Sequence, residues 1–236
     1  GLMLDFYLIV SDYASAYDKR WLARANALIP PNVFPFHHAK MASKYAVLSE
    51  ADFDRLNRPE TASVSVWARF AQPSRLVWAS DDAARGRAID AVARAAPTLL
   101  SAAMPFAKGG DDLDPWRQAF ALTYSAELRA ERKGRSGSIV DTDPERYRRF
   151  LAPALAAVEA GGPRASWARR RLEGKLLSVI RLAKASATYT GGADYIAWKI
   201  NRHAGTSIEL KPWQRRHPLL AAISLLPRLL RSGAIR

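Results

Sequence analysis

The sequence contains no cysteine, and that absence removes several kinds of chemistry at once. Without a thiol, the 236-residue chain forms no disulfide, no thiolate nucleophile and no zinc–thiolate site. No stretch reaches the roughly 18 consecutive apolar residues that a membrane-spanning helix needs. Histidine is also scarce. The adjacent pair His37 and His38 would point to opposite sides of an extended chain, which favours a structural or surface role over a shared metal.

Acidic residues are few compared with basic ones: 22 Asp and Glu face 36 Lys and Arg, which gives a formal net charge of +14. A basic excess of this size indicates an anionic partner. Nucleic acid, an anionic membrane surface and a polyphosphate substrate all meet that requirement, and composition does not rank them. Hydrophobic residues make up 49% of the chain and include seven tryptophans, which is enough for a sizeable core and excludes wholesale disorder.

The opening stretch GLMLDFYLIVSDY (1–13) has the composition of a buried strand, yet it contains Asp5. Burying a carboxylate is costly unless a cation pairs with it. Acids on the sheets of nucleotidyltransferases hold Mg²⁺ against a nucleoside triphosphate, which would explain such an acid. Met3 and Tyr7, two residues away on either side, are not magnesium ligands. Asp12, at the end of the strand, is a reserve ligand. The alternative is that Asp5 lies at a strand edge or pairs with an arginine.

Strand-like and helical patterns alternate over the first half of the chain. We expect helices at 18–28, 49–57 and 81–104, and strands at 44–49 and 74–80, whereas VSVWARF (64–70) fits either. The second half is mostly helical, with expected helices at 115–131, 143–158 and 164–187 and a glycine turn at 188–195. We therefore predict an α+β fold, with a mixed sheet lobe at 1–110, a helical lobe at 111–210 and a basic amphipathic tail at 211–236.

The segment LTYSAELRAERKGRSGS (122–138) combines acids, bases and glycines and is a second candidate for chemistry. If Glu127 reaches Asp5 it completes a metal site, and the basic residues and the glycine loop then hold phosphates. The alternative is a solvated helix face. Helical spacing would place like charges four residues apart, as in Glu127 and Glu131, which does not fit a stabilising ion-pair pattern.

The basic helix at 164–187 and the tail surround apolar stripes with arginine and tryptophan, which is typical of a helix at a membrane interface. We predict contact with an anionic membrane surface. Nucleic-acid binding competes with this interpretation, although phosphate-binding segments rarely need a run such as LLAAISLL. The third possibility is that the tail packs on the core. The predicted membrane-binding residues are Arg215, Arg216, Leu219, Leu220 and Arg228.

Five motifs spread over residues 1–205 are similar to those of one known family. In chain order they are MLDFYLIV, KYAVLSEADFDRL, VWARFAQPSRLVWA, LTYSAELRAE and KASATYTGGADYIAWKINRH. Together they resemble the mitochondrial-type phosphatidate cytidylyltransferases, which are CDP-diacylglycerol synthases with a nucleotidyltransferase fold. The chain departs from that pattern at three places: Gln72 stands where the family has lysine, Glu127 where it has aspartate, and Ala126 where it has glycine.

The resemblance implies that CTP and phosphatidic acid react, with Mg²⁺ as the cofactor, to give CDP-diacylglycerol and pyrophosphate. It implies that Asp5 and Glu127 are metal ligands and that Arg69 and Arg129 steady the triphosphate or the lipid headgroup. Further substrate-binding residues on this basis are Lys44, Arg132 and Lys133. The family's Gly-Ser-Gly phosphate loop is not in this chain, so we expect a further segment upstream of Gly1.

A protein of this family works peripherally at a membrane. We therefore expect the cytoplasmic face of the inner membrane in a bacterium, or the matrix side in a mitochondrion, and no specific nucleic-acid partner. Two other classes stay open. One is a non-catalytic membrane-surface module with a degenerate nucleotidyltransferase fold, and the other is an RNA-binding nucleotidyltransferase.

Overall fold

The computed structural model describes residues 4–38, 41–106, 110–128, 139–158 and 165–188, followed by 194, 197, 201, 206–216, 221, 224, 225 and 227. The chain divides into two compact units that alternate along the sequence. The sheet unit comprises Gly1–Asp52, Leu128–Arg132 and Leu176–Arg236, and the helical unit comprises Phe53–Glu127 and Lys133–Lys175. The boundaries expected near residues 110 and 210 stay predictions.

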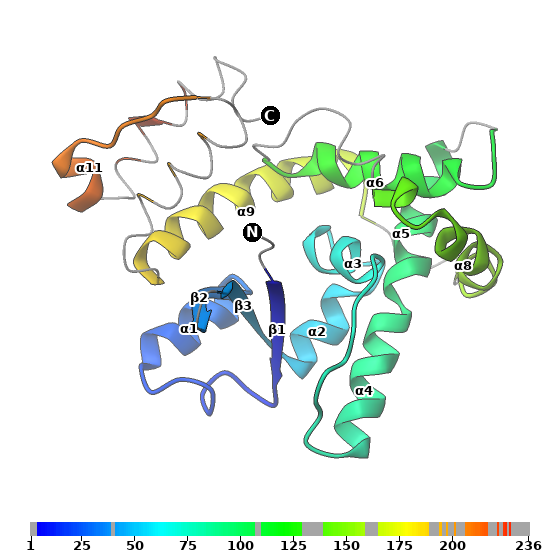
Figure 1. The fold of residues 1–236 in the computed structure, drawn as a ribbon, viewed down its shortest axis with the longest axis horizontal. Coiled ribbons are helices and arrows are strands. Elements are labelled where there is room, and N and C mark those ends of the chain that lie inside the picture. Colours follow the sequence, from blue (N-terminus) through cyan, green and yellow to red (C-terminus); the bar gives the residue numbers. More distant parts are fainter. Residues whose placement is uncertain are drawn as a thin grey trace. The chain divides into compact units, whose positions relative to one another are not determined.

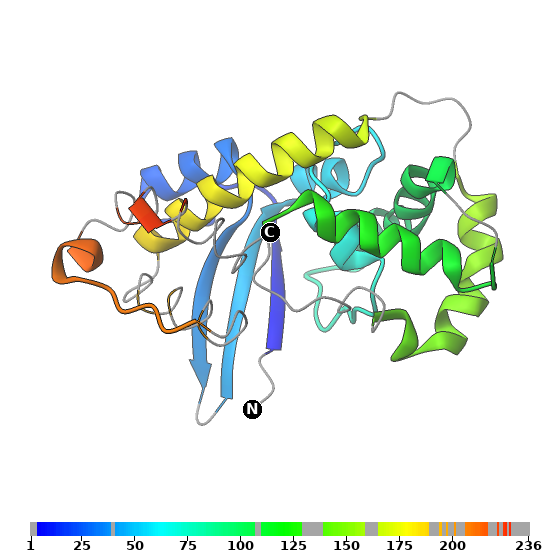
Figure 2. The ribbon, with the colours of Figure 1, turned by 90° about the horizontal axis from the view of Figure 1, so that it is seen from above.

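A mixed three-stranded sheet lies in the sheet unit (Figure 1), so the predicted α+β class is confirmed. Its strands are β1 (Leu4–Val10), β2 (Asn32–His38) and β3 (Met41–Ser49), in the order β1-β3-β2. β1 pairs parallel to β3, and β2 pairs antiparallel to it. Figure 2 shows the three strands side by side. The strand expected in the opening stretch is confirmed, whereas β2 was not expected from the sequence.

Helix α1 (Arg20–Leu28) connects β1 to β2, and the buried side chain of Asn26 ties it to the sheet. The Asn26 amide donates to the carbonyl of Val47 and to the Tyr17 hydroxyl, each over 3.0 Å. Its Oδ1 accepts from the N–H of Asn32 over 2.6 Å. One side chain therefore satisfies backbone groups of two different strands, which a buried polar residue must do to avoid a desolvation penalty.

The remaining regular elements of the described chain are helices. Their bounds are α2 (Glu50–Leu56), α3 (Ser65–Phe70), α4 (Asp82–Ala93), α5 (Ala95–Ala103), the 3₁₀ turn η1 (Met104–Phe106), α6 (Asp114–Ala126), α8 (Pro144–Ala156), α9 (Trp167–Thr188) and α11 (Pro212–Arg216). Within the described ranges, no helix combines the length and apolar character that crossing a bilayer requires.

The core of the helical unit surrounds α5, which packs against α3, α6 and α8. Its largest side chains, Trp67, Trp116, Phe120 and Tyr147, are almost fully buried. The Trp116 indole donates to the carbonyl of Tyr147 over 2.9 Å, so this aromatic group packs without leaving its N–H unpaired. Four large aromatic side chains therefore gather in this core, whereas other tryptophans of the chain, such as Trp78, are exposed.

Three expectations about the secondary structure need correction. The helix expected at 81–104, for which an interruption at Pro97 was the alternative, is two helices. They meet at Arg94, and Pro97 lies in the first turn of α5, where a missing N–H is tolerated. The helix expected to reach residue 131 ends at Ala126. The segment 74–80 forms no strand, because the described residues offer it no ladder partner. The glycine turn and most of the tail lie outside the described residues.

Candidate functional site

Asp5 and Lys44 face each other on the parallel strands β1 and β3. The Lys44 ammonium lies 3.4 Å from the Asp5 carboxylate, and the two side chains are 31% and 28% exposed. Asp5 is therefore not a fully buried acid, and one cation beside it is Lys44. The pairing with an arginine that was considered from the sequence stays a prediction. The register of Asp5 and Lys44 is fixed because β1 pairs with β3 along its whole length.

The surroundings of this pair are apolar on the side of the core. Successive residues of a strand point to alternate faces, so Lys44 shares its face with Ala46 and Leu48, which are both buried. The pair thus lies at the solvent-accessible end of a buried face. A carboxylate in such a position can bind a hard cation, and an ammonium beside it can contact a phosphate oxygen.

Mg²⁺ commonly takes one or two carboxylates, several waters and the phosphates of a substrate. Asp5 offers one carboxylate, and the described residues contain no group of three His, Asp or Glu side chains arranged around a possible metal position. That donor set fits an ion that arrives with a triphosphate. Glu127, the second predicted ligand, belongs to the helical unit and Asp5 to the sheet unit. Their pairing stays a prediction.

Glu127 itself follows the last residue of α6 and has an extended backbone, with φ of −116° and ψ of 156°. Glu127 therefore does not lie on a helix face, and the like-charge argument, which assumed helical spacing, does not apply to it. The end of α6 is held firmly, because a Cβ on Gly174 of α9 would lie 2.2 Å from the carbonyl oxygen of Ala126. Only glycine permits so close an approach of two backbones.

Of the remaining predicted site residues, the structure describes Arg69, Arg215 and Arg216. Arg69 lies exposed in the last turn of α3, in the helical unit. Arg215 and Arg216 are exposed in α11, and Arg215 donates to Asp194 over 2.9 Å. Arg129, Arg132, Lys133, Leu219, Leu220 and Arg228 lie outside the described residues.

Helix α9 has an exposed face that combines apolar and basic side chains. Leu172 and Leu176 lie one turn apart and are 73% and 58% exposed. Arg171 and Lys175 lie next to them and are also exposed. Among the described residues, no carboxylate is paired with either cation, whereas Arg169 binds Glu173 over 2.5 Å. This face has the character of an interfacial surface.

Some basic residues of α9 do not lie on that face, contrary to the sequence interpretation. Arg170 is 1% exposed and donates to the carbonyls of Thr61 and Pro59 over 2.6 and 2.9 Å. Its guanidinium also lies over the rings of Trp67 and Trp167, and burial lowers its pKa to about 10. Arg170 therefore contributes to the helical unit's interior and not to a cationic surface.

Arg181 and Lys184 are a second inward pair, in the sheet unit. Arg181 donates to the carbonyl of Pro30 over 3.1 Å, and Lys184 donates to the carbonyls of Ile29 and, over 2.8 Å, Pro31. Burial, assisted by the Arg181 charge, lowers the pKa of Lys184 to about 8. The helical spacing from Trp167 through Arg170, Gly174 and Arg181 to Lys184 was the available signal that these cations share the inward stripe.

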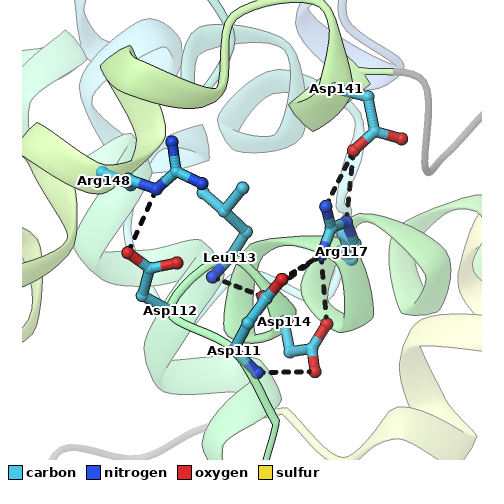
Figure 3. Close-up of polar contacts among 7 residues, drawn as sticks. All are labelled: Asp111, Asp112, Leu113, Asp114, Arg117, Asp141 and Arg148. Atoms are coloured by element: carbon cyan, nitrogen blue, oxygen red, sulfur yellow. Dashed lines mark hydrogen bonds and ion pairs between the residues drawn. The ribbon is translucent and has the colours of Figure 1, made fainter.

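A network around Arg117 was missed from the sequence (Figure 3). Arg117 lies 3.0 Å from Asp111, 3.3 Å from Asp114 and 2.9 Å from Asp141. The Arg117 hydrogen bond is the main cause that lowers the pKa of Asp111, and the carboxylates in turn raise the pKa of Arg117. Because an arginine neutralises these acids, the network links the start of α6 to the segment before α8 and is not arranged for a metal.

Tyr13, which follows β1, donates to Asp52 over 2.7 Å, and burial raises the pKa of Tyr13 to about 12.

In the helical unit, a cavity of about 290 Å³ is lined by side chains that include Arg58, Glu60, Asp90 and Arg94. Its lining includes two arginines and two acids, and both arginines bind Asp54. The cavity therefore has no dominant charge with which to select a ligand.

Asp12, the reserve ligand, accepts two bonds from Ser15, from the N–H over 2.8 Å and from the hydroxyl over 2.9 Å. The backbone N–H of Ser15 is the main cause that lowers the Asp12 pKa. Asp12 therefore caps the turn after β1, and a role as a metal ligand would have to compete with these bonds.

Comparisons with known proteins do not add a family to this geometry. A scan against protein-family models gives no match, and a search of the curated proteins finds no similar sequence. The resemblance to phosphatidate cytidylyltransferases therefore depends on the short motifs around Asp5, Lys44 and Glu127, and membership of that family stays a prediction.

Proposed function

We propose that the chain is a nucleotidyltransferase that converts CTP and phosphatidic acid to CDP-diacylglycerol and pyrophosphate. The observation that carries the proposal is the ion pair between Asp5 and Lys44 on neighbouring strands of a mixed sheet. It joins the two residue types that a metal–triphosphate substrate needs, a carboxylate for the cation and an ammonium for the phosphate. The net charge of +14 supports two anionic substrates.

In this reaction a phosphate oxygen of phosphatidic acid attacks the α-phosphorus of CTP. A new P–O bond forms, the bond from the α-phosphorus to the bridging oxygen breaks, and pyrophosphate leaves with that oxygen. Mg²⁺, when bound with the triphosphate, would supply charge neutralisation. Asp5 would hold that ion, and Lys44 would exchange its contact with Asp5 for one with a phosphate oxygen. Glu127, Arg69 and Arg129 are proposed to assist from the helical unit and the segment after α6.

A lipid substrate requires access to a membrane surface. The exposed face of α9 supports such access, because Leu172 and Leu176 can enter the headgroup boundary while Arg171 and Lys175 meet anionic lipid. We propose a peripheral location, on the cytoplasmic face of the inner membrane in a bacterium or the matrix side in a mitochondrion. Arg215 and Arg216 are proposed to add to the same attraction.

The direct test is turnover of CTP with phosphatidate vesicles and Mg²⁺, measured as released pyrophosphate. Removal of a residue that stabilises developing charge commonly costs about 10²–10³-fold in turnover, so Asp5→Asn is expected to lose activity on that scale. Asp18→Asn is the matched control, because Asp18 is an exposed acid of the same unit. Equal turnover by the wild type and Asp5→Asn would overturn the assignment.

A second candidate is a membrane-surface module without catalysis. The exposed face of α9 favours it, because that face explains lipid contact without any reaction. Such a module would float with anionic vesicles and show no Mg²⁺-dependent heat with CTP. RNA binding is separated by competition: an RNA-binding protein would release the vesicles when RNA is added, and its affinity would fall steeply with salt.

A further inference from the structure

Residues 74–80, Ser-Arg-Leu-Val-Trp-Ala-Ser, have the composition of a strand but no strand partner. They connect α3 to α4 within the helical unit as an open coil without a helical turn (Figure 1). Among the described residues, no backbone hydrogen bond involves the N–H or C=O groups of residues 73–79. The segment therefore presents a row of backbone donors and acceptors that a second strand can use.

The same segment exposes three large apolar side chains in succession. Leu76, Val77 and Trp78 are 42%, 73% and 74% exposed. Adjacent side chains of a strand-like chain point to opposite sides, so the high exposure of both Val77 and Trp78 means that solvent reaches both sides. Exposed apolar side chains beside unpaired backbone groups mark a site of association.

The chemistry of the segment favours a strand over a lipid as the occupant. Hydrocarbon offers no partner for the free backbone groups, whereas a second strand pairs with them. Two acids, Asp81 and Asp82, follow the segment directly and would face an anionic surface unfavourably. A polypeptide strand therefore satisfies both the backbone and the apolar side chains.

We propose that residues 74–80 of two copies of this chain pair as antiparallel strands about a two-fold axis at Val77. In this register Val77 lies opposite itself, Leu76 opposite Trp78, and Ser74 opposite Ser80. One face then gathers the leucines and tryptophans of both copies. On the other face Arg75 lies diagonal to Asp81 of the second copy, within reach of its long side chain. The segment is thus complementary to itself in shape and charge, as an isologous interface requires.

The size of the interface sets what kind of dimer to expect. A two-stranded ribbon by itself is only marginally stable in water, so the dimer is reversible and increases with protein concentration. The dimer does not depend on the proposed enzymatic function, because Asp5 and Lys44 belong to the other unit.

Cysteine cross-linking tests the register, and the chain supplies no cysteine of its own to interfere. Directly opposite residues of an antiparallel pair have Cα atoms about 4.5–5.5 Å apart, which lies within the roughly 4.4–6.8 Å that a disulfide spans. Val77→Cys is therefore expected to form a covalent dimer under mild oxidation. The matched control is Arg75→Cys, because Arg75 is also exposed but lies four residues, about 13 Å, from its own copy. Equal cross-linking of the two variants would overturn the register.

Sedimentation of the cysteine-free chain tests the dimer itself. Val77→Lys places two ammonium groups on the axis and is expected to raise the dimer dissociation constant at least tenfold, with unchanged thermal unfolding because the side chain is exposed. A wild-type protein that stays monomeric at every concentration would overturn the proposal. If, in addition, Val77→Lys abolished flotation with phosphatidylglycerol vesicles, the segment would be a lipid contact instead.

Discussion

The sheet unit and the helical unit differ in the size of the side chains that they bury. Among the described residues, the largest fully buried side chains all lie in the helical unit except Leu48 and Asn26. In the sheet unit Asn26 and Asn32 are both fully buried, and their hydrogen bonds connect α1 to the strands. The helical unit buries polar residues too, such as Asn57 and Arg170, but it adds a larger apolar core.

Helix α9 contributes one inward cation to each unit, and the two cations differ in how deeply they are buried. Arg170 is enclosed in the helical unit by carbonyls and by two tryptophan rings. Lys184 is only partly buried in the sheet unit, where its partners are carbonyls of Ile29 and Pro31. The helical unit thus encloses its cation fully, whereas the sheet unit leaves Lys184 partly open to solvent.

The largest effect on stability is expected from the aromatic core of the helical unit. Trp67 is 0% exposed, so Trp67→Ala should lower the free energy of unfolding by about 3–5 kcal/mol, as large core truncations do. Trp21→Ala is the control in the sheet unit, because Trp21 is 48% exposed and should cost much less. Urea unfolding of both variants checks this difference. Equal losses would break the comparison between the two units.

The next effect is expected from the polar network of the sheet unit. Asn26→Ala leaves the N–H of Asn32 and the carbonyl of Val47 without this partner, and should cost roughly 2–6 kcal/mol at about 1–3 kcal/mol for each unsatisfied group. Tyr17→Phe removes only the hydroxyl that accepts a hydrogen bond from the Asn26 amide, and should lower the free energy of unfolding by less. Thermal unfolding distinguishes the two variants. A neutral Asn26→Ala would show that the sheet unit does not depend on this network.

A smaller effect is expected where two helices of the helical unit touch. Gly174→Ala forces a Cβ against the carbonyl of Ala126 and should destabilise by about 1–3 kcal/mol through overpacking. Gly86→Ala is the matched control, because Gly86 lies inside α4 with nothing within 4 Å of its Cβ position. It should stabilise by roughly 0.5–1 kcal/mol. Chemical unfolding would contradict the close approach of α6 and α9 if both variants gained stability.

The smallest effect concerns the pH dependence that Lys184 gives to the sheet unit. Its pKa is lowered to about 8, whereas an unfolded lysine titrates near about 10.4. Between these values the unfolded state binds more protons, so the stability of the wild type should rise with pH relative to Lys184→Met. Urea unfolding of both proteins from pH 7 to 10 measures this difference. A wild-type stability that fell with rising pH relative to Lys184→Met would contradict the lowered pKa of Lys184.

Local patterns predicted the elements whose signals are local. The helix expected at 49–57 begins where its N-cap is local: Ser49 accepts from the N–H of Asp52 at the start of α2, and serine is a preferred N-cap residue. Pro35 and two histidines concealed β2, because these residues weaken a strand pattern, although β2 pairs with the next strand in sequence, from His38 opposite Met41 to Asn32 opposite Val47. Residues 74–80 have strand propensity, yet propensity cannot supply a partner strand.

The candidate site was predictable in part for the same reason. Asp5 stood out because an acid in an apolar strand is unusual, and Lys44 was named from its motif. Their contact required the parallel register of β1 and β3, which no local pattern contains. The inward direction of Arg170 and Lys184 was readable from helical spacing, but a basic composition suggested a surface instead.

Asp5, beside Lys44, is proposed to bind a metal–triphosphate substrate. Calorimetric titration of CTP with and without Mg²⁺ tests it on the wild type, Asp5→Asn and Asp18→Asn, after all three show the same thermal unfolding. We expect heat of CTP binding that requires Mg²⁺ in the wild type and in Asp18→Asn, and an affinity for CTP at least tenfold weaker in Asp5→Asn. The same Mg²⁺-dependent affinity in Asp5→Asn as in the wild type would contradict it.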